Sequence, residues 1–144
     1  MSECGSKLTE FVEGLGLGEV FGAHNGYRLS DYTLRAPRVS YISHKKWKHI
    51  THPYSYLPFA PDIAVEIVPY DTSELEIRQM CAPYVRAGTR YVWVCQPDLQ
   101  RLTVYSRYEN PRVFTRNDNL RLPKWHPEFI VPLKEILPKP RRFN

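Results

Sequence analysis

The chain has only three cysteines and no long apolar run. Cys4, Cys81 and Cys95 form neither a CxxC nor a CxxH pair, which argues against a zinc site. Cys81 and Cys95 fall in a predicted helix and a predicted strand, so we expect buried free thiols in a reducing compartment. No apolar segment is long enough to cross a bilayer, and the first residues, MSECGSKLTEF, lack the apolar core of a signal peptide. These absences favour a cytoplasmic protein.

What is present fits one globular domain. A chain of 144 residues can bury a core without staples, and we expect residues 1–144 to form a single domain. The hydrophobic fraction of 42% lies near the average for soluble domains. The net charge of +5 would favour a phosphate-rich partner without requiring one.

Two acids alternate with branched apolar residues at the start of the segment 60–96. With a side-chain period of two, Asp62 and Glu66 project from one face of a predicted strand, and the other face is lined by Ile63, Val65 and Ile67. A buried carboxylate is costly unless it meets a cation, a metal or strong donors. The two acids are therefore candidate functional residues, although Asp62 could simply cap the strand start and Glu66 could pair with an arginine.

A helix with clear end signals follows this strand. Ser73 and Glu76 match a capping box, and Gly88 can stop the helix in a left-handed conformation. The run Tyr91–Cys95 then predicts a strand covered on both faces, so the segment 60–96 should form a strand–helix–strand crossover. The apolar residues expected near one face of this helix are Leu75, Met80, Tyr84 and Ala87.

Shorter elements surround this crossover. A helix is predicted over 7–15, where apolar residues recur at helical spacing. Asn25-Gly26 is a strong hairpin signal, so strands at 19–23 and 27–29 are expected to pair. The remaining predicted elements are strands at 34–43, 102–105 and 113–115 and a helical turn at 133–137.

Basic residues cluster between the strand at 34–43 and the crossover. Trp47 lies among them, and the set comprises His44, Lys45, Lys46, Lys48, His49 and His52. Such a loop could face nucleic acid, with cations for phosphates and an aromatic ring for stacking. It could equally be a solvated loop with Trp47 packed onto the domain.

Several blocks occur together in one order: GEVFGAHNGYRL, RAPRVSYIS, APDIAVEIV, DTSELE, YVRAG and YVWVCQP. Over residues 8–137 this order resembles the putative restriction endonuclease family abundant in cyanobacteria, within the PD-(D/E)xK nuclease superfamily. The resemblance implies an α/β (α+β) fold, a restriction-endonuclease-like mixed sheet flanked by helices. It also implies Mg²⁺-dependent hydrolysis of DNA phosphodiesters, in which acids hold the ion and a lysine assists.

Only part of the family's catalytic pattern is present. Asp62 and Glu66 match its acids at the second strand, and they would be the ligands of any metal. Arg38 stands where the pattern has an aspartate, and Met80 stands where it has the active-site lysine. Gln96 replaces a further acid, and the family's first strand has no counterpart in this chain.

We therefore expect Arg38 and Glu66 to form a buried ion pair, with the guanidinium in the place of the metal. Alternatively, Asp62 and Glu66 still bind metal and Arg38 contacts the phosphate. The first arrangement predicts an impaired nuclease or a non-catalytic DNA-binding or structural protein. In that protein DNA would be held through Lys45, Lys46 and Lys48.

A homodimer is also expected, since enzymes that cut both strands often pair two subunits. Aromatic side chains at the end of the basic loop could supply the interface or could pack beneath the loop. These residues are Tyr54, Tyr56 and Phe59.

Overall fold

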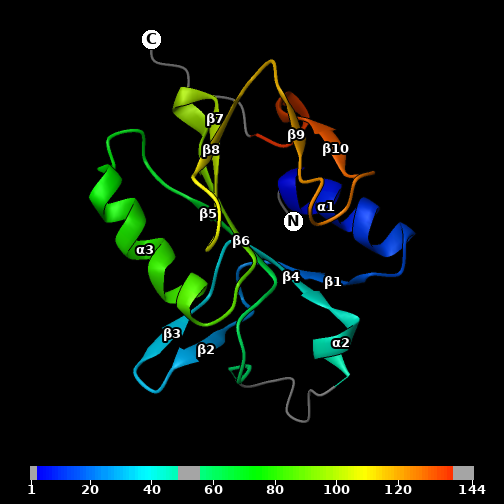
Figure 1. The fold of residues 1–144 in the computed structure, drawn as a ribbon, viewed down its shortest axis with the longest axis vertical. Helices are drawn as coiled ribbons and strands as arrows, with labels where there is room; N and C mark the ends of the chain where they lie inside the picture. The colour runs from blue at the N-terminus through cyan, green and yellow to red at the C-terminus, as the bar shows by residue number, and fades with distance from the viewer. Residues whose placement is uncertain (1–2, 49–55, 138–144) are drawn as a thin grey trace.

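A six-stranded mixed sheet lies at the centre of the computed structural model, which describes residues 3–48 and 56–137 (Figure 1). The strand order is β1-β4-β5-β6-β7-β8. β5 and β6 run parallel, and the other neighbouring pairs of this sheet are antiparallel. The strands are β1 (Gly18–Phe21), β4 (Val39–Ser43), β5 (Ile63–Ile67), β6 (Tyr91–Gln96), β7 (Arg101–Tyr105) and β8 (Arg112–Thr115).

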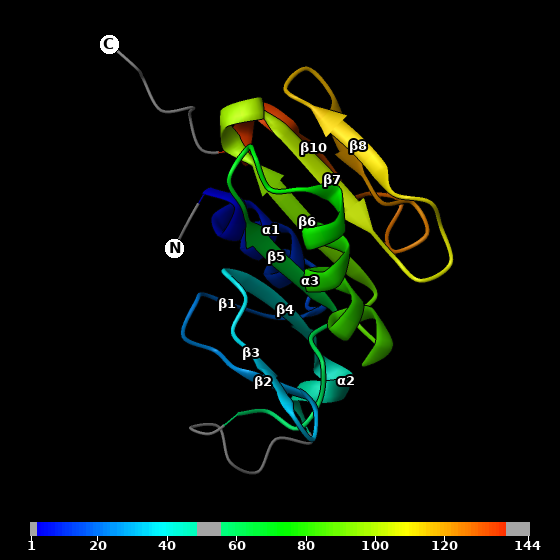
Figure 2. The same cartoon turned by 90° about the vertical axis from the view of Figure 1, so that its left-hand side faces the viewer.

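Helices cover both faces of this sheet, as the family resemblance implied. α3 (Glu74–Arg86) lies on one face and α1 (Glu3–Gly14) on the other, as the two views in Figures 1 and 2 show. Among the described residues, no helix has the length and apolar character needed to cross a membrane. The other elements are β2 (Tyr27–Ser30), β3 (Thr33–Arg35), α2 (His44–Trp47), η1 (Pro97–Leu99), β9 (Asn119–Arg121), β10 (Ile130–Pro132) and η2 (Leu133–Glu135).

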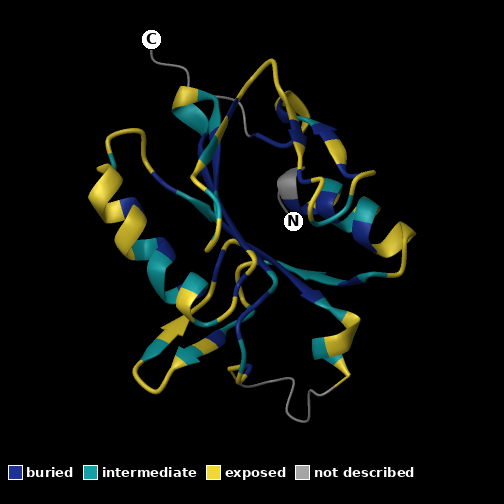
Figure 3. Cartoon of the chain, viewed as in Figure 1, coloured by how far each residue is buried: buried dark blue, intermediate teal, exposed yellow. Residues whose placement is uncertain are grey.

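The alternation predicted for the first strand of the crossover is confirmed. Ile63 and Val65 pack in the core on the α1 side of the sheet, whereas Ala64 packs on the α3 side. Every residue of β6 is buried, so the central strands form the dark centre of Figure 3. This arrangement leaves Glu66 on the face that α3 covers.

The predicted limits of α3 are also confirmed. Ser73 and Glu76 form both hydrogen bonds of a capping box, and Gly88 follows the helix with φ +105°. The prediction that Leu75 shares a face with Tyr84 is wrong, because the Leu75 side chain is 65% exposed whereas Tyr84 is buried. The buried stripe comprises Ile77, Cys81 and Tyr84. Cys81 and Cys95 are buried and form no disulfide with each other, as expected.

The predicted hairpin between residues 19–23 and 27–29 is wrong. β1 pairs with β4, and β2 pairs instead with β3 through the turn at Asp31-Tyr32. Asn25 is used differently, because its side chain donates a hydrogen bond to the hydroxyl of Tyr27. The predicted strand 34–43 is divided between β3 and β4 at Ala36-Pro37, since proline cannot donate to a strand ladder.

The C-terminal segment contributes a small sheet that the sequence did not indicate. β9 and β10 pair antiparallel over three residues each and lie beside α1 (Figure 1). Strands this short leave little periodicity to detect. The turn expected at 133–137 is present as η2.

Candidate functional site

Glu66 meets α3 through a single hydrogen bond. The hydroxyl of Tyr84, which is fully buried, donates to Glu66 Oε1 at 2.9 Å. Burial raises the pKa of the Glu66 carboxyl, and the Tyr84 hydrogen bond and the positive charge of Arg35 oppose that rise in part. Glu66 therefore has one strong donor and one nearby cation from β3.

A second hydrogen-bonded cluster joins β2 of the small sheet to β4 of the central sheet. The Tyr27 hydroxyl and Ser40 Oγ are 2.6 Å apart, and Asn25 Nδ2 donates to the Tyr27 hydroxyl at 2.9 Å. Burial raises the pKa of Tyr27 to about 12, with the Asp62 carboxylate acting in the same direction. The phenol of Tyr27 also helps to raise the pKa of Tyr84, after burial and Glu66. The two clusters are thus close enough to interact electrostatically.

Arg38 does not form the expected ion pair with Glu66. Val39 pairs with Val65, so Arg38 lies one residue before β4, beside the strand that carries Glu66. Its side chain is nevertheless exposed, and no salt bridge between described residues includes it. Arg35 is the arginine whose charge acts on Glu66. An exposed position lets the Arg38 guanidinium keep its hydration, which a buried pair would remove.

Met80 lies one helical turn before Tyr84 on α3, where it packs against the apolar cluster between helix and sheet. Arg78 cannot substitute for the missing lysine in this conformation, because its guanidinium is exposed and pairs with Glu74 at 2.7 Å. The α3 face therefore presents the Met80 thioether at the position where the resemblance led us to expect a lysine.

The structure does not bring Asp62 and Glu66 together. Four residues of extended chain separate them, or about 13 Å. Asp62 Oδ2 accepts a hydrogen bond from the Ser43 backbone N–H at 2.8 Å, and Oδ1 lies 3.4 Å from Lys46 Nζ. The observed role of Asp62 is to join β5 to the start of α2, which is the capping alternative for this residue.

These residues do not fit a divalent metal ion. Mg²⁺ prefers several oxygen ligands, whereas Glu66 is accompanied by the Tyr84 hydroxyl and the positive charge of Arg35. Within residues 3–48 and 56–137, no three His, Cys, Asp or Glu side chains form a group that could hold a metal. An arginine near the single carboxylate occupies the electrostatic role that a cation would fill.

The basic segment divides into structural and exposed residues. Lys46 Nζ donates to the Ala60 carbonyl at 2.8 Å in addition to pairing with Asp62. The Trp47 ring packs on Phe21 with a centroid distance of 5.2 Å, as the solvated-loop alternative predicted. Lys45 and Lys48 are exposed and remain candidates for phosphate contacts. The predictions for His49 and His52 lie outside the described residues.

Two of the three aromatic residues considered for a dimer interface can be located. Phe59 packs against the small apolar cluster of Tyr27, Ile42 and Leu57, with Lys46 Nζ 5.9 Å from its ring centroid. Tyr56 is exposed and borders Gly26. Tyr54 lies outside the described residues. Phe59 therefore packs onto the domain, whereas Tyr56 remains exposed.

Gln96, which the resemblance placed at the position of an acid, is buried and bonded to an arginine of β7. Arg101 Nε and Nη2 donate to Gln96 Oε1 at 3.1 and 2.9 Å. The Gln96 amide oxygen thus accepts two hydrogen bonds from the Arg101 guanidinium, as a carboxylate could. The sequence identified the substitution but gave no sign of its partner, which only the β6–β7 pairing supplies.

Sequence reasoning missed Arg35, Tyr27 and Ser40 as neighbours of the site. The only local signal was the polar Ser40 between the apolar residues Val39 and Tyr41. Its buried hydroxyl needs a partner, and the structure provides Tyr27 from a separate hairpin.

Comparisons with known proteins agree with this fold. The family model described as Uma2, "Putative restriction endonuclease", matches residues 3–134. A crystal structure of a putative nuclease belonging to DUF820 from Anabaena variabilis superposes with a TM-score of 0.77 at 20% sequence identity, covering 93% of this chain and 75% of that one. No curated protein matches the chain. The family match covers most of the sequence, and the chain therefore belongs to the Uma2 family of putative restriction endonucleases.

Proposed function

We propose that this protein is a DNA-binding member of its family whose hydrolytic site is disarmed. The observation that carries the proposal is the environment of Glu66, whose carboxylate accepts the Tyr84 hydroxyl and lies near Arg35. Metal-dependent hydrolysis needs an oxygen-rich site for the ion and a group that assists the nucleophile. Arg38 and Met80 supply neither.

Electrostatics supports the loss of the metal. The positive charge of Arg35 acts on Glu66 and would also repel Mg²⁺ at this partly buried carboxylate, where the effective dielectric constant is below that of water. The buried carboxyl also has a raised pKa, so its charged form is less favoured than at the surface. Both effects lower the affinity of this position for a metal ion, which hydrolysis would require.

DNA remains the partner that the charge distribution favours. The chain is basic, with a net charge of +5, and Lys45 and Lys48 are exposed at α2. Lysines at such positions bind DNA phosphates and do not read the bases. The affinity for DNA should therefore depend on the salt concentration and not on the base sequence.

Hydrolysis is tested by incubating supercoiled DNA with the protein and Mn²⁺. Mn²⁺ binding is measured by calorimetry. We expect wild type to leave the DNA intact and to bind no Mn²⁺, whereas the double variant Arg38→Asp, Met80→Lys should gain Mn²⁺ binding. The control Arg116→Asp, Gln79→Lys makes the same charge changes at exposed positions and should behave as wild type. Mn²⁺-dependent nicking by wild type that Glu66→Ala abolishes would instead establish a working nuclease.

DNA binding is tested separately by a salt titration on a short duplex. In the variant Lys45→Gln, Lys48→Gln, we expect weaker binding and a salt slope lower by about 1 to 2, one unit for each lost phosphate contact. The control Arg116→Gln, Lys134→Gln removes two exposed cations elsewhere and should retain the wild-type slope. Identical slopes for the two variants would show that α2 is not the DNA surface.

A further inference from the structure

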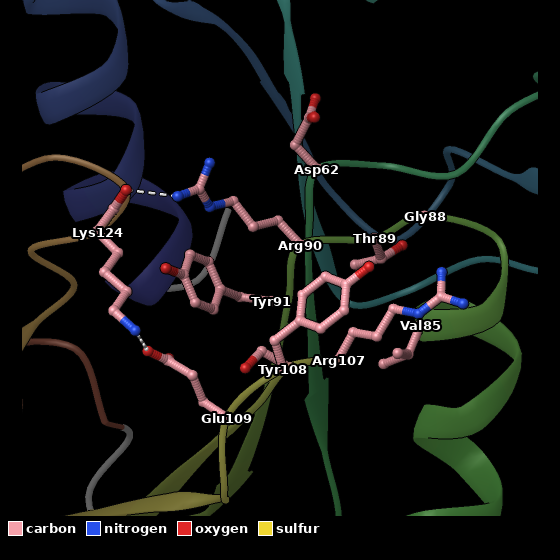
Figure 4. Close-up of a pocket in the computed structure, with 11 residues that line it drawn as sticks. Asp62, Val85, Gly88, Thr89, Arg90, Tyr91, Arg107, Tyr108, Glu109 and Lys124 are labelled. Carbon is pink, nitrogen blue, oxygen red and sulfur yellow. Dashed lines mark hydrogen bonds and ion pairs between the residues drawn. The ribbon is translucent and has the colours of Figure 1, made fainter.

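A pocket lies where β5 and β6 begin, away from Glu66. Its walls come from the turn between α3 and β6, from the turn between β7 and β8, and from Lys124 (Figure 4). It encloses about 670 Å³. Small-ligand sites fall within roughly 300–1,000 Å³, so the space suits a ligand of nucleotide size.

The charges lining this pocket do not cancel. Three cationic side chains and two carboxylates contribute to the wall. Lys124 Nζ pairs with Glu109 Oε1 at 2.5 Å and lowers the pKa of that carboxyl, while Asp62 is paired with Lys46. Arg90 and Arg107 form no salt bridge with any carboxylate in the described part of the chain. Two guanidinium groups are left to attract an anion.

Arg90 is held in place by neutral partners. Its guanidinium donates to the backbone carbonyl of Lys124 and lies over the Tyr91 ring, 5.5 Å from the centroid. Those contacts use one nitrogen and one face of the group, so further N–H donors remain for a planar, two-point contact with phosphate oxygens. Because the Arg90 side chain is already held in place, less of its conformational entropy is lost when a ligand binds.

The nearby end of α3 does not oppose an anion as strongly as an uncapped helix would. A helix C-terminus carries partial negative charge on its free carbonyl groups. Here the carbonyls of Pro83, Tyr84 and Val85 accept hydrogen bonds from the backbone N–H groups of the C-terminal turn. The arginines therefore dominate the local field.

An aromatic ring completes the pocket. Tyr108 is 89% exposed, and the Arg107 guanidinium lies 5.7 Å from its ring centroid. In the view of Figure 4, the Tyr108 ring stands between the side chains of Arg90 and Arg107. An exposed ring beside arginines is a platform on which a nucleobase can stack.

We propose that this pocket binds a nucleoside phosphate, with Tyr108 against the base and with Arg90 and Arg107, on either side of that ring, attracting the phosphate. The ligand is either a free nucleotide or the terminal nucleotide of a strand, since both present the same chemistry. The inference is independent of the proposed function, because it uses neither Glu66 nor the lysines of α2.

Calorimetry on the full chain with 5′-AMP, adenosine and inorganic phosphate tests the proposal. We expect 5′-AMP to bind at least tenfold more tightly than adenosine. The variant Arg90→Gln, Arg107→Gln should lose roughly tenfold or more in AMP affinity, as expected for charge-assisted contacts. The control Arg28→Gln, Arg116→Gln alters two exposed arginines elsewhere and should bind as wild type.

Tyr108→Ala distinguishes a nucleotide site from a simple anion site. This exposed substitution should weaken AMP binding severalfold and leave inorganic phosphate binding unchanged. Failure of AMP to bind at millimolar concentration, equal binding of adenosine, or AMP affinity unaffected by either the arginine or the tyrosine variant would overturn the proposal. Thermal melting of each variant establishes that the fold is retained.

Single strands of ten nucleotides with and without a 5′-phosphate identify the source of the ligand. Tighter binding of the phosphorylated strand than of AMP supports a strand terminus, and tighter binding of AMP supports a free nucleotide. Duplex binding through Lys45 and Lys48 is measured separately, so either proposal can fail alone.

Discussion

At the scale of single residues, Glu66 is a partly buried carboxyl whose pKa is raised by its surroundings. It lies on the α3 face of β5, with the Tyr84 hydroxyl as its hydrogen-bond donor and Arg35 as a nearby cation. Burial raises its pKa, so the folded state binds the carboxyl proton more tightly than the unfolded chain does. Folding stability is therefore lost as the pH rises from the ordinary glutamate pKa through the raised value, and the loss persists above it.

Glu66→Gln should raise the free energy of unfolding at pH 8 and change it little at acid pH below the ordinary glutamate pKa. The amide oxygen can still accept from Tyr84, while the buried charge is removed. Urea denaturation at both pH values measures the difference. The exposed control Glu128→Gln should show no such pH dependence. An equal effect of Glu66→Gln at both pH values would contradict burial as the cause.

At the scale of elements, β1 is joined closely to β4 because Gly18 has no side chain. Gly18 pairs with Ser43, and a Cβ at this position would meet the Ile42 carbonyl oxygen and lie 2.9 Å from Ser43 Cα. The preceding turn is fixed by hydrogen bonds from the Leu17 N–H to the Val12 carbonyl and from the His44 N–H to the Leu17 carbonyl. α1, β1 and the start of α2 are thus connected at one point.

Gly18→Ala should destabilise the protein by about 1–3 kcal/mol, since the backbone of β4 must move to admit the methyl group. Chemical denaturation measures this cost. Gly22→Ala is a matched control, because a Cβ there has no heavy atom within 4 Å. Equal stability of the two variants would show that β1 can separate from β4 without cost.

At the scale of the whole molecule, a cluster of aromatic rings joins the C-terminal segment to the rest. Phe129 lies 4.9 Å from Phe11 of α1, 5.2 Å from Trp125 and 5.9 Å from Trp93 of β6, measured between ring centroids. Phe129 therefore contacts α1, the segment at Trp125 and the central sheet at once, within the larger apolar cluster that they share.

Phe129→Ala should cost about 3–5 kcal/mol, the range for removing a large buried ring. Because domains are stable by only about 5–15 kcal/mol, this loss should also speed amide hydrogen exchange in α1 and β9. Tyr32→Ala serves as the control, since the Tyr32 ring is 98% exposed and its loss should be nearly neutral. Loss of stability without faster exchange in α1 would contradict the proposed connection.

Features of the fold that depend on a few neighbouring residues could be predicted from the sequence, whereas contacts between distant segments could not. Ser73, Glu76 and Gly88 were enough to predict where α3 begins and ends. The alternation of side chains was enough to predict the two faces of β5. These predictions depend on capping hydrogen bonds and side-chain periodicity, which the sequence contains directly. The family resemblance added the mixed sheet and its flanking helices.

Which strands pair, and what faces Glu66, was decided only by tertiary structure. Asn25-Gly26 predicts a hairpin locally, yet β1 gains more by pairing with β4 across the closely packed Gly18. The separation of Asp62 from Glu66, the exposure of Arg38 and the contact between Tyr84 and Glu66 all depend on where α3 and the β2–β3 hairpin cross the sheet. The physical reason is that these contacts join residues far apart in the chain, whose meeting is fixed by the packing of whole elements rather than by local preference.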